Sequence, residues 1–69
     1  MRVRVRIYGG ETIILEFEKD KALVKEVIEK LGLLPTATIV TRKGRVLLEE
    51  ELVYNDDELT VYRLQDFIS

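Results

Sequence analysis

Strict alternation of polar and apolar residues opens the chain and predicts a half-buried β-strand. In residues 2–8, "RVRVRIY", the arginines occupy even positions and the branched apolar residues occupy odd positions, so the two kinds of side chain face opposite sides. Residues 12–18 alternate in the same way. Because Gly9 and Gly10 separate the two segments, the pattern predicts a β-hairpin.

The register of this hairpin is predicted from the requirement that the two apolar faces coincide. We expect a three-residue loop at residues 9–11, because a two-residue turn would bury a charge opposite an apolar residue. This loop places Arg4 opposite Glu16 and Arg2 opposite Glu18 on the solvent face. The arginines of the first strand are therefore expected to form a ladder of cross-strand ion pairs rather than a phosphate-binding stripe.

Arg6 is the exception in this ladder. The same register sets it opposite Ile14, so Arg6 has no carboxylate directly across from it. Both side chains are expected on the solvent face of the sheet, where they are available to a partner.

The apolar period lengthens to about 3.6 residues after Asp20, which predicts one helix of about three turns. Asp20 is expected to cap its first turn, and Gly32 stands where a helix commonly ends. The apolar face of the helix is expected to pack on three of the predicted strands. The expected contacts join Val24, Val27, Ile28 and Leu31 to Val5, Leu15, Leu59 and Val61.

The second half of the chain predicts three more strands. "TATIVTR" at 36–42 reaches a turn at Lys43-Gly44, a short strand follows at 45–48, and "ELTVYRLQ" at 58–65 closes the chain. The glutamates at 49–51 are expected to form a solvated loop, since three successive carboxylates do not converge on one cation. The order β-β-α-β-β-β predicts an α+β fold with one mixed four- to five-stranded sheet packed on one helix.

Composition narrows the functional classes. The chain has 69 residues without Cys or His, which predicts a single domain over residues 1–69, no metal or other cofactor, and no enzyme activity. The net charge of −2 argues against a nucleic-acid or anionic-membrane partner. No window approaches the roughly 18 apolar residues of a membrane span, so we expect a cytoplasmic protein. The 35% of charged residues is typical of thermophilic proteins.

The segment "IEKLGLLPTATIVTRKGRVLLEEELVYNDDELTVYR" resembles the ThiS/MoaD family of small sulfur carriers. The shared succession is a helix ending in Leu-Gly-Leu, a strand, a Gly turn, a short apolar strand, acidic residues, an Asp-rich turn and a final strand. The resemblance covers nearly the whole chain and implies the ubiquitin-like β-grasp fold. It also implies a protein partner, either an adenylating (E1-like) enzyme or a sulfur-transfer enzyme.

The tail, residues 65–69, departs from the family pattern. Family members end in Gly-Gly, whose carboxylate is adenylated and then converted to a thiocarboxylate or, in protein modifiers, to an amide. Alignment from the turn at residues 55–57 puts Phe67 and Ile68 about where those glycines would lie. A bulky and a β-branched residue resist threading through a narrow channel. We therefore expect no adenylation of this tail, and expect replacement of residues 67–69 by Gly-Gly to permit some.

Three hypotheses follow for the function. The first is a non-conjugating protein-binding module, possessing the family's docking face and lacking a reactive tail. The second is a working sulfur carrier or protein modifier with an unusual C-terminus, in thiamine, molybdopterin or tRNA thiolation. The third is an RNA-associated accessory domain. For the first, a protein partner or a second copy is expected to contact the exposed sheet face and the tail, through Arg6, Ile14, Thr60, Tyr62, Leu64, Phe67, Ile68 and Ser69.

Overall fold

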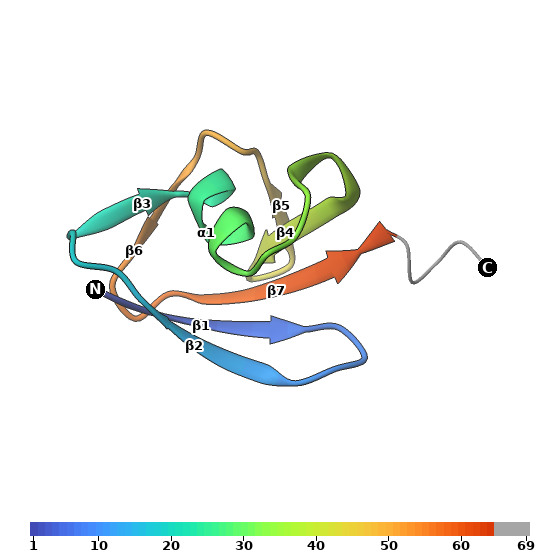
Figure 1. The fold of residues 1–69 in the computed structure, drawn as a ribbon, viewed down its shortest axis with the longest axis horizontal. Helices are drawn as coiled ribbons and strands as arrows, with labels where there is room; N and C mark the ends of the chain where they lie inside the picture. Colours follow the sequence, from blue (N-terminus) through green and yellow to red (C-terminus); the bar gives the residue numbers. More distant parts are fainter. Residues whose placement is uncertain (65–69) are drawn as a thin grey trace.

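The computed structural model describes residues 1–64, and in this range a mixed five-stranded sheet is covered on one face by one α-helix (Figure 1). This arrangement confirms the predicted α+β class with a sheet packed on a helix. In chain order the elements are β1 (Arg2–Ile7), β2 (Thr12–Glu16), β3 (Lys21–Leu23), α1 (Val24–Lys30), the 3₁₀ turn Pro35–Ala37, β4 (Thr38–Arg42), β5 (Arg45–Leu47), β6 (Leu52–Tyr54) and β7 (Glu58–Arg63).

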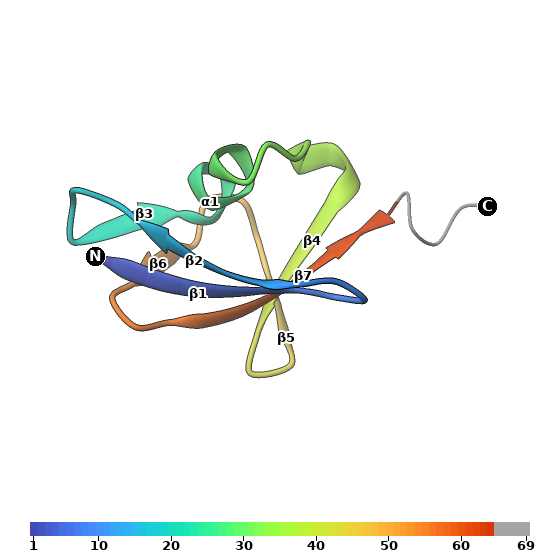
Figure 2. The ribbon, with the colours of Figure 1, turned by 60° about the horizontal axis from the view of Figure 1, so that its bottom comes forward.

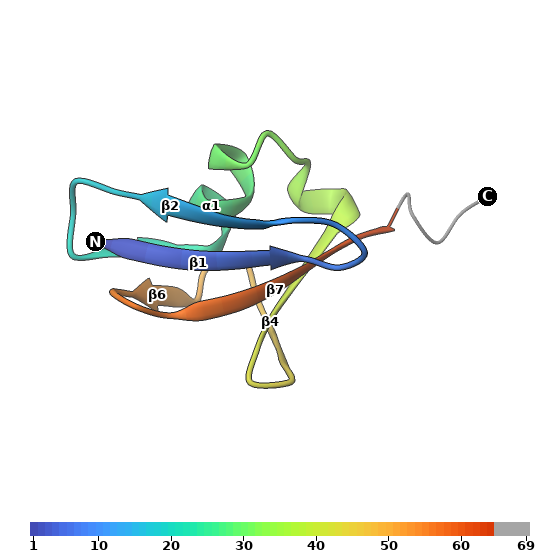
Figure 3. The same cartoon turned by 90° about the horizontal axis from the view of Figure 1, so that it is seen from below.

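The sheet has the strand order β2-β1-β7-β4-β5, so the first and last strands of the described chain lie at its centre. β1 and β7 run parallel, and every other neighbouring pair in this sheet is antiparallel. Figure 2 shows α1 on one side of the sheet and the β4–β5 hairpin projecting from it. Seen from below in Figure 3, β2 is the outermost strand next to β1.

The core lies between α1 and the sheet, as the apolar pattern predicts. Val24, Val27 and Ile28 on α1 are buried together with apolar residues from all five strands of the large sheet. All four predicted strand contacts belong to this cluster: Val5, Leu15, Leu59 and Val61. Leu31 packs at the margin of the cluster and is only partly buried, because the helix ends one residue before it.

The hairpin register differs from the predicted one by two residues. Arg4 lies opposite Ile14 rather than Glu16, and Arg2 lies opposite Glu16 rather than Glu18. Arg6 lies opposite Thr12, not Ile14. A shift of two residues leaves every side chain on its predicted face, so the requirement for coincident apolar faces does not distinguish the two registers.

The turn decides between them. Its loop is Tyr8–Gly10 rather than Gly9–Glu11, since the Gly10 N–H donates to the Ile7 carbonyl (2.8 Å) and the Ile7 N–H donates to the Glu11 carbonyl (3.0 Å). Gly9 adopts a φ of 75°, a conformation that glycine reaches without the steric cost of a side chain. The position of the flexible glycine inside the turn therefore sets the register.

The start of the helix also differs from the prediction. Asp20 does not cap it, because residues Lys21–Leu23 instead form β3, which pairs with β6 in a small second sheet. Ala22 and Val53, directly opposite each other in this pair, are both buried. The helix has seven residues, about two turns rather than the predicted three, because β3 takes the residues before Val24. It ends near Gly32, as predicted, with Gly32 at a φ of 77°.

Glu26 takes the capping role that Asp20 lacks. Its Oε2 accepts the Leu23 N–H (2.8 Å), and its Oε1 pairs with the Lys19 ammonium group. These contacts, the backbone hydrogen bond first, lower the pKa of the Glu26 carboxyl group from its ordinary value. The ionised carboxylate therefore stabilises the folded state.

The lowered pKa of Glu26 predicts an acid-dependent loss of stability. Glu26 contributes fully at pH values above its unfolded-state pKa, and the contribution is lost as the pH falls through the lower folded-state pKa. Glu26→Gln should flatten the stability profile in that acid range, measured by urea unfolding from neutral pH downwards. An unchanged profile would contradict the capping role, and Glu29→Gln on the exposed helix surface serves as the control.

The acidic segment before β6 is a loop with exposed Glu49 and Glu50 side chains, as predicted, and its backbone also bonds to α1. The Glu51 carbonyl accepts the Val24 N–H and the Glu49 carbonyl accepts the Lys25 N–H, so the segment caps the start of α1. The Glu51 carboxylate accepts the Leu48 N–H (2.7 Å), which ends β5 before Leu48. Within residues 1–64 no group of three or more acidic side chains is placed to hold a metal ion. No helix in that range has the length and apolarity needed to cross a membrane.

Candidate functional site

The face of the sheet opposite α1 carries the even-numbered residues of β1 and β2. One row of directly opposed residues crosses all five strands on this face: Thr12, Arg6, Thr60, Thr41 and Val46. We call this surface the open face. Polar hydroxyls dominate the middle of the row, and Val46 at its end is 57% exposed.

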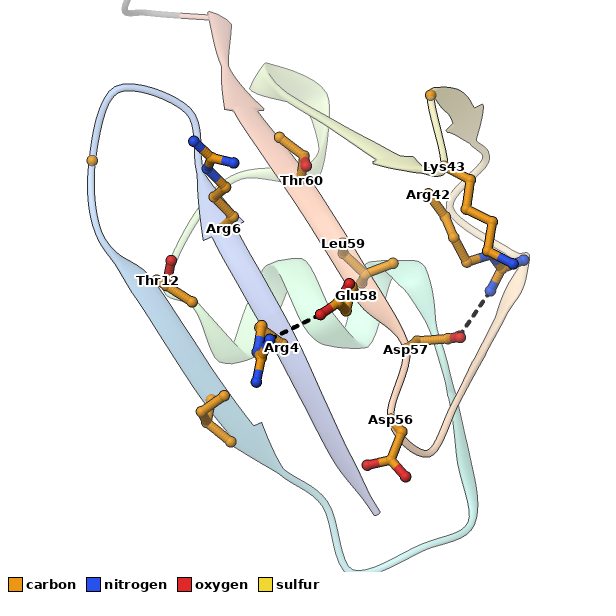
Figure 4. Close-up of a pocket in the computed structure, with 13 residues that line it drawn as sticks. Arg4, Arg6, Thr12, Arg42, Lys43, Asp56, Asp57, Glu58, Leu59 and Thr60 are labelled. Carbon is orange, nitrogen blue, oxygen red and sulfur yellow. Dashed lines mark hydrogen bonds and ion pairs between the residues drawn. The ribbon is translucent and has the colours of Figure 1, made fainter.

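A shallow depression lies on the open face, and Figure 4 shows its lining. Arg4 and Arg6 extend into it from β1, and Thr60 lies across from Arg6 on β7. The turn after β4 contributes Lys43, and the turn before β7 contributes Asp56. Side chains from both halves of the chain therefore meet here.

Two ion pairs neutralise part of this surface. Arg4 Nη1 lies 2.9 Å from Glu58 Oε1, and Arg42 Nη1 lies 2.9 Å from Asp57 Oδ2 (Figure 4). The predicted partner of Arg4, Glu16, instead pairs with Arg2 at 3.1 Å.

Arg6 and Lys43 are different from these paired cations. Among the residues that the structure describes, no carboxylate lies within ion-pair distance of either one. Arg6 is flanked on neighbouring strands by the short side chains of Thr12 and Thr60, which leave its guanidinium group accessible. Arg6 and Lys43 lie on opposite sides of the depression, so an anionic group is favoured at either side (Figure 4).

An aromatic pair, Tyr8 and Tyr62, follows Arg6 and Thr60 by two residues along the same two segments of the chain. The ring centroids of Tyr8 and Tyr62 are 5.1 Å apart with an interplanar angle of 32°. Tyr8 is 54% exposed, and Tyr62 lies directly opposite the half-buried Ile39 of β4. Aromatic rings that keep one side exposed provide large contact area at low conformational cost.

The structure brings together most of the described residues predicted for this site. Arg6, Ile14 and Thr60 line the depression, and Tyr62 lies farther along the same strand as Thr60. Leu64 follows β7 and is half-buried. The other predicted residues, Phe67, Ile68 and Ser69, lie outside the described residues.

The sequence interpretation missed several residues of this surface, notably Tyr8, Lys43 and Val46. Tyr8 adjoins two glycines and was assigned only a place in the hairpin. Its contact with Tyr62 depends on the parallel pairing of β1 with β7, which local periodicity does not show. Lys43 belongs to a turn signal, Lys43-Gly44, whose position in space depends on the order of strands.

No protein-family model matches the chain, and no curated protein matches it either. The side chains of the site themselves indicate what it can bind. Guanidinium, ammonium, hydroxyl and phenol groups beside exposed apolar side chains can form ion pairs, hydrogen bonds and apolar contacts. Such a combination suits recognition.

Proposed function

We propose that this chain is a ubiquitin-like β-grasp protein related to the ThiS/MoaD carriers, and that it acts as a protein-binding module through its open face. The observation that carries the proposal is Arg6, which has no ion-pair partner among residues 1–64, beside the Tyr8–Tyr62 pair. A charged group without a partner next to accessible aromatic rings is the usual composition of an interface centre.

The arrangement of elements supports the β-grasp assignment. The β1–β2 and β4–β5 hairpins flank β7, which pairs parallel with β1, and the helix crosses one face of the sheet (Figure 1). The connection from β2 to β4 contains α1, as the predicted order requires. The face opposite the helix is then the surface left for a partner.

The chemistry of the face indicates the chemistry of its partner. Apolar or aromatic side chains of the partner would cover Tyr8 and Val46, and its carboxylates would neutralise Arg6 and Lys43. The resemblance to sulfur carriers names an E1-like adenylating enzyme as the class of partner. Asp56 also lines the depression and would repel a nucleic-acid backbone, which argues against RNA as the partner.

A binding measurement with a purified E1-like adenylating enzyme tests the proposal. Arg6→Glu and Tyr62→Ala should each weaken binding by about tenfold or more, as expected for central interface residues. The measurement is isothermal titration calorimetry, with and without ATP, after unfolding curves have shown that each variant is folded.

Lys25→Ala serves as the control. Lys25 is a solvent-exposed residue of α1, and α1 lies on the other side of the sheet from the open face. Its affinity should equal that of the unmodified chain. Absence of binding, or equal weakening by Lys25→Ala, would refute docking through the open face. Salt-sensitive binding to single-stranded RNA with the same dependence on Arg6 would favour the RNA hypothesis instead.

A further inference from the structure

β2 is an edge strand whose outer side has regular unpaired peptide groups. The Ile7 N–H donates to Glu11, so odd-numbered residues of β2 exchange hydrogen bonds with β1. The N–H and C=O groups of Thr12, Ile14 and Glu16 therefore point away from the sheet. Within residues 1–64 no hydrogen bond to any of these six groups is present.

The opposite edge does not provide a comparable surface. β5 has three residues, and the two-residue turn Lys43-Gly44 makes Arg45 and Leu47 the ones that bond to β4. Only Val46 directs its peptide groups outward, because the N–H of Leu48 is bonded by Glu51. A second strand would gain few hydrogen bonds there.

β2 lacks several of the features that usually protect an edge strand, and its one charged residue, Glu16, lies at its end. Its five residues, "TIILE", include no Pro and no Lys, and they pair with β1 in an uninterrupted register. Ile14 lies at the centre of the strand and is 45% exposed. An edge with an apolar centre and unpaired peptide groups favours pairing with another strand.

We propose that β2 pairs antiparallel with β2 of a second copy of this chain, about a two-fold axis at Ile14. In this register Ile14 lies opposite Ile14 of the second copy, and Thr12 lies opposite Glu16 of that copy. All three residues have outward peptide groups, so the pairing forms six backbone hydrogen bonds. The two sheets become one, with both helices on the same face.

Charge supports this register. Thr12 lies between Glu16 of the second copy and its own Arg6 in one row of the joined sheet. Strands are separated by about 4.8 Å, so about 9.6 Å separates the two charged residues, a distance that an arginine and a glutamate side chain can span. Glu16 pairs with Arg2 of its own protomer at 3.1 Å, so in the dimer its carboxylate is shared between that Arg2 and Arg6 of the other copy, which lacks a carboxylate within the described part of its protomer.

Neighbouring registers are less favourable. A shift by one residue would set residues whose peptide groups bond to β1 opposite residues whose peptide groups point away from the sheet, so the two strands could not exchange hydrogen bonds. A shift by two residues opposes Thr12 to Glu18 in one direction and Glu16 to Gly10 in the other; neither Glu18 nor Gly10 belongs to β2, so fewer residues of the strand pair with each other. On the helix side, only the proposed register sets the half-buried Ile13 opposite Leu15 of the second copy. The backbone pairing rests on β2 and not on the Tyr8–Tyr62 pair, whereas Arg6 is shared with the proposed function; substitutions at Ile14 therefore test the dimer, and Tyr62→Ala tests the proposed function.

A cysteine cross-link tests the two-fold axis directly. The natural chain has no cysteine, so Ile14→Cys introduces one thiol per protomer. Opposed residues of a hydrogen-bonded antiparallel pair have Cα atoms about 5.5 Å apart, within the range of a disulfide. Under mild oxidation we expect rapid formation of a species of twice the 8.0 kDa protomer mass.

Thr12→Cys on the same edge is the matched control. Its thiol lies opposite Glu16, four residues along the strand from its own counterpart, or about 14 Å. We expect Thr12→Cys to form the disulfide about tenfold more slowly than Ile14→Cys, or slower still. Equal rates for the two variants would indicate random collision and would overturn the proposed axis.

A proline substitution tests the hydrogen bonds. Ile14→Pro removes an outward N–H that is not needed within the protomer, so the fold should survive while the dimer dissociation constant rises by about tenfold or more. Val46→Pro is the control at the corresponding outward position of β5, and it should leave dimerisation unchanged. Sedimentation equilibrium measures both. A protomer that stays monomeric at every protein concentration, or a dimer insensitive to Ile14→Pro, would refute the proposal.

Discussion

Replacing Ile28 with alanine is expected to destabilise the protein by about 2–5 kcal/mol, the range for buried Ile truncation. Ile28 lies on α1 with 1% of its surface exposed, and it packs in the cluster that joins the helix to the sheet. A domain of this length has a total stability of only about 3–10 kcal/mol. Ile28→Ala is therefore expected to unfold a large fraction of the molecules.

Urea unfolding followed by circular dichroism measures this loss. Leu34→Ala is the control, because Leu34 is 69% exposed and its truncation should change the free energy of unfolding by less than about 0.5 kcal/mol. A loss below about 1 kcal/mol for Ile28→Ala would mean that the helix packs on the sheet through another face.

Replacing Asp57 with alanine is expected to cost about 2–3 kcal/mol. Asp57 Oδ2 accepts the Tyr54 N–H (2.8 Å) and an N–H of the Arg42 guanidinium group (2.9 Å). The same guanidinium nitrogen donates to the Leu52 carbonyl (3.1 Å), so Asp57 links β4, β6 and the turn before β7. Its removal leaves a largely buried cation and a backbone donor without their acceptor.

The Arg4–Glu58 pair provides the control for Asp57→Ala. Its N···O distance is also 2.9 Å, but its side chains are 60% and 69% exposed, compared with 21% and 23% for Arg42 and Asp57. Glu58→Ala should therefore cost less than about 1 kcal/mol, because solvent screens an exposed pair. Urea unfolding compares the two variants. Equal losses would show that burial does not determine the contribution of these pairs.

Several features of the fold follow from local sequence pattern alone. The alternation in residues 2–8 and 12–18 assigns each side chain of the first hairpin to the correct face. The stripe of apolar residues after position 23 identifies the buried face of α1. Lys43-Gly44 identifies a tight turn, and both residues have positive φ there. These features depend on side-chain period or on backbone preference, which neighbouring residues already determine.

The hairpin register illustrates a limit of pattern. Both candidate registers place Val3 and Val5 on the buried face, so burial is equal in the two. The difference lies in which residues form the loop, and Gly9 at positive φ with the bond from Gly10 to Ile7 resolves it. A local conformational preference thus outweighed the expected ion pairs.

The start of the helix illustrates a second limit. Asp20 is a good capping residue by type, but Lys21–Leu23 gain more by pairing with Leu52–Tyr54, about thirty residues later in the chain. A three-residue strand carries almost no periodic signal. Its existence is therefore decided by tertiary contact, here the burial of Ala22 against Val53.

The open face was determined in part by sequence and in part by tertiary structure. Periodicity alone placed Arg6, Ile14 and Thr60 on the face away from the helix. Only the parallel pairing of β1 with β7 brought Glu58 to Arg4 and Tyr62 to Tyr8. Periodicity reports which side of a strand a residue occupies, because successive side chains alternate. The neighbour across a strand boundary depends on strand order and register, which are set by contacts between distant segments of the chain.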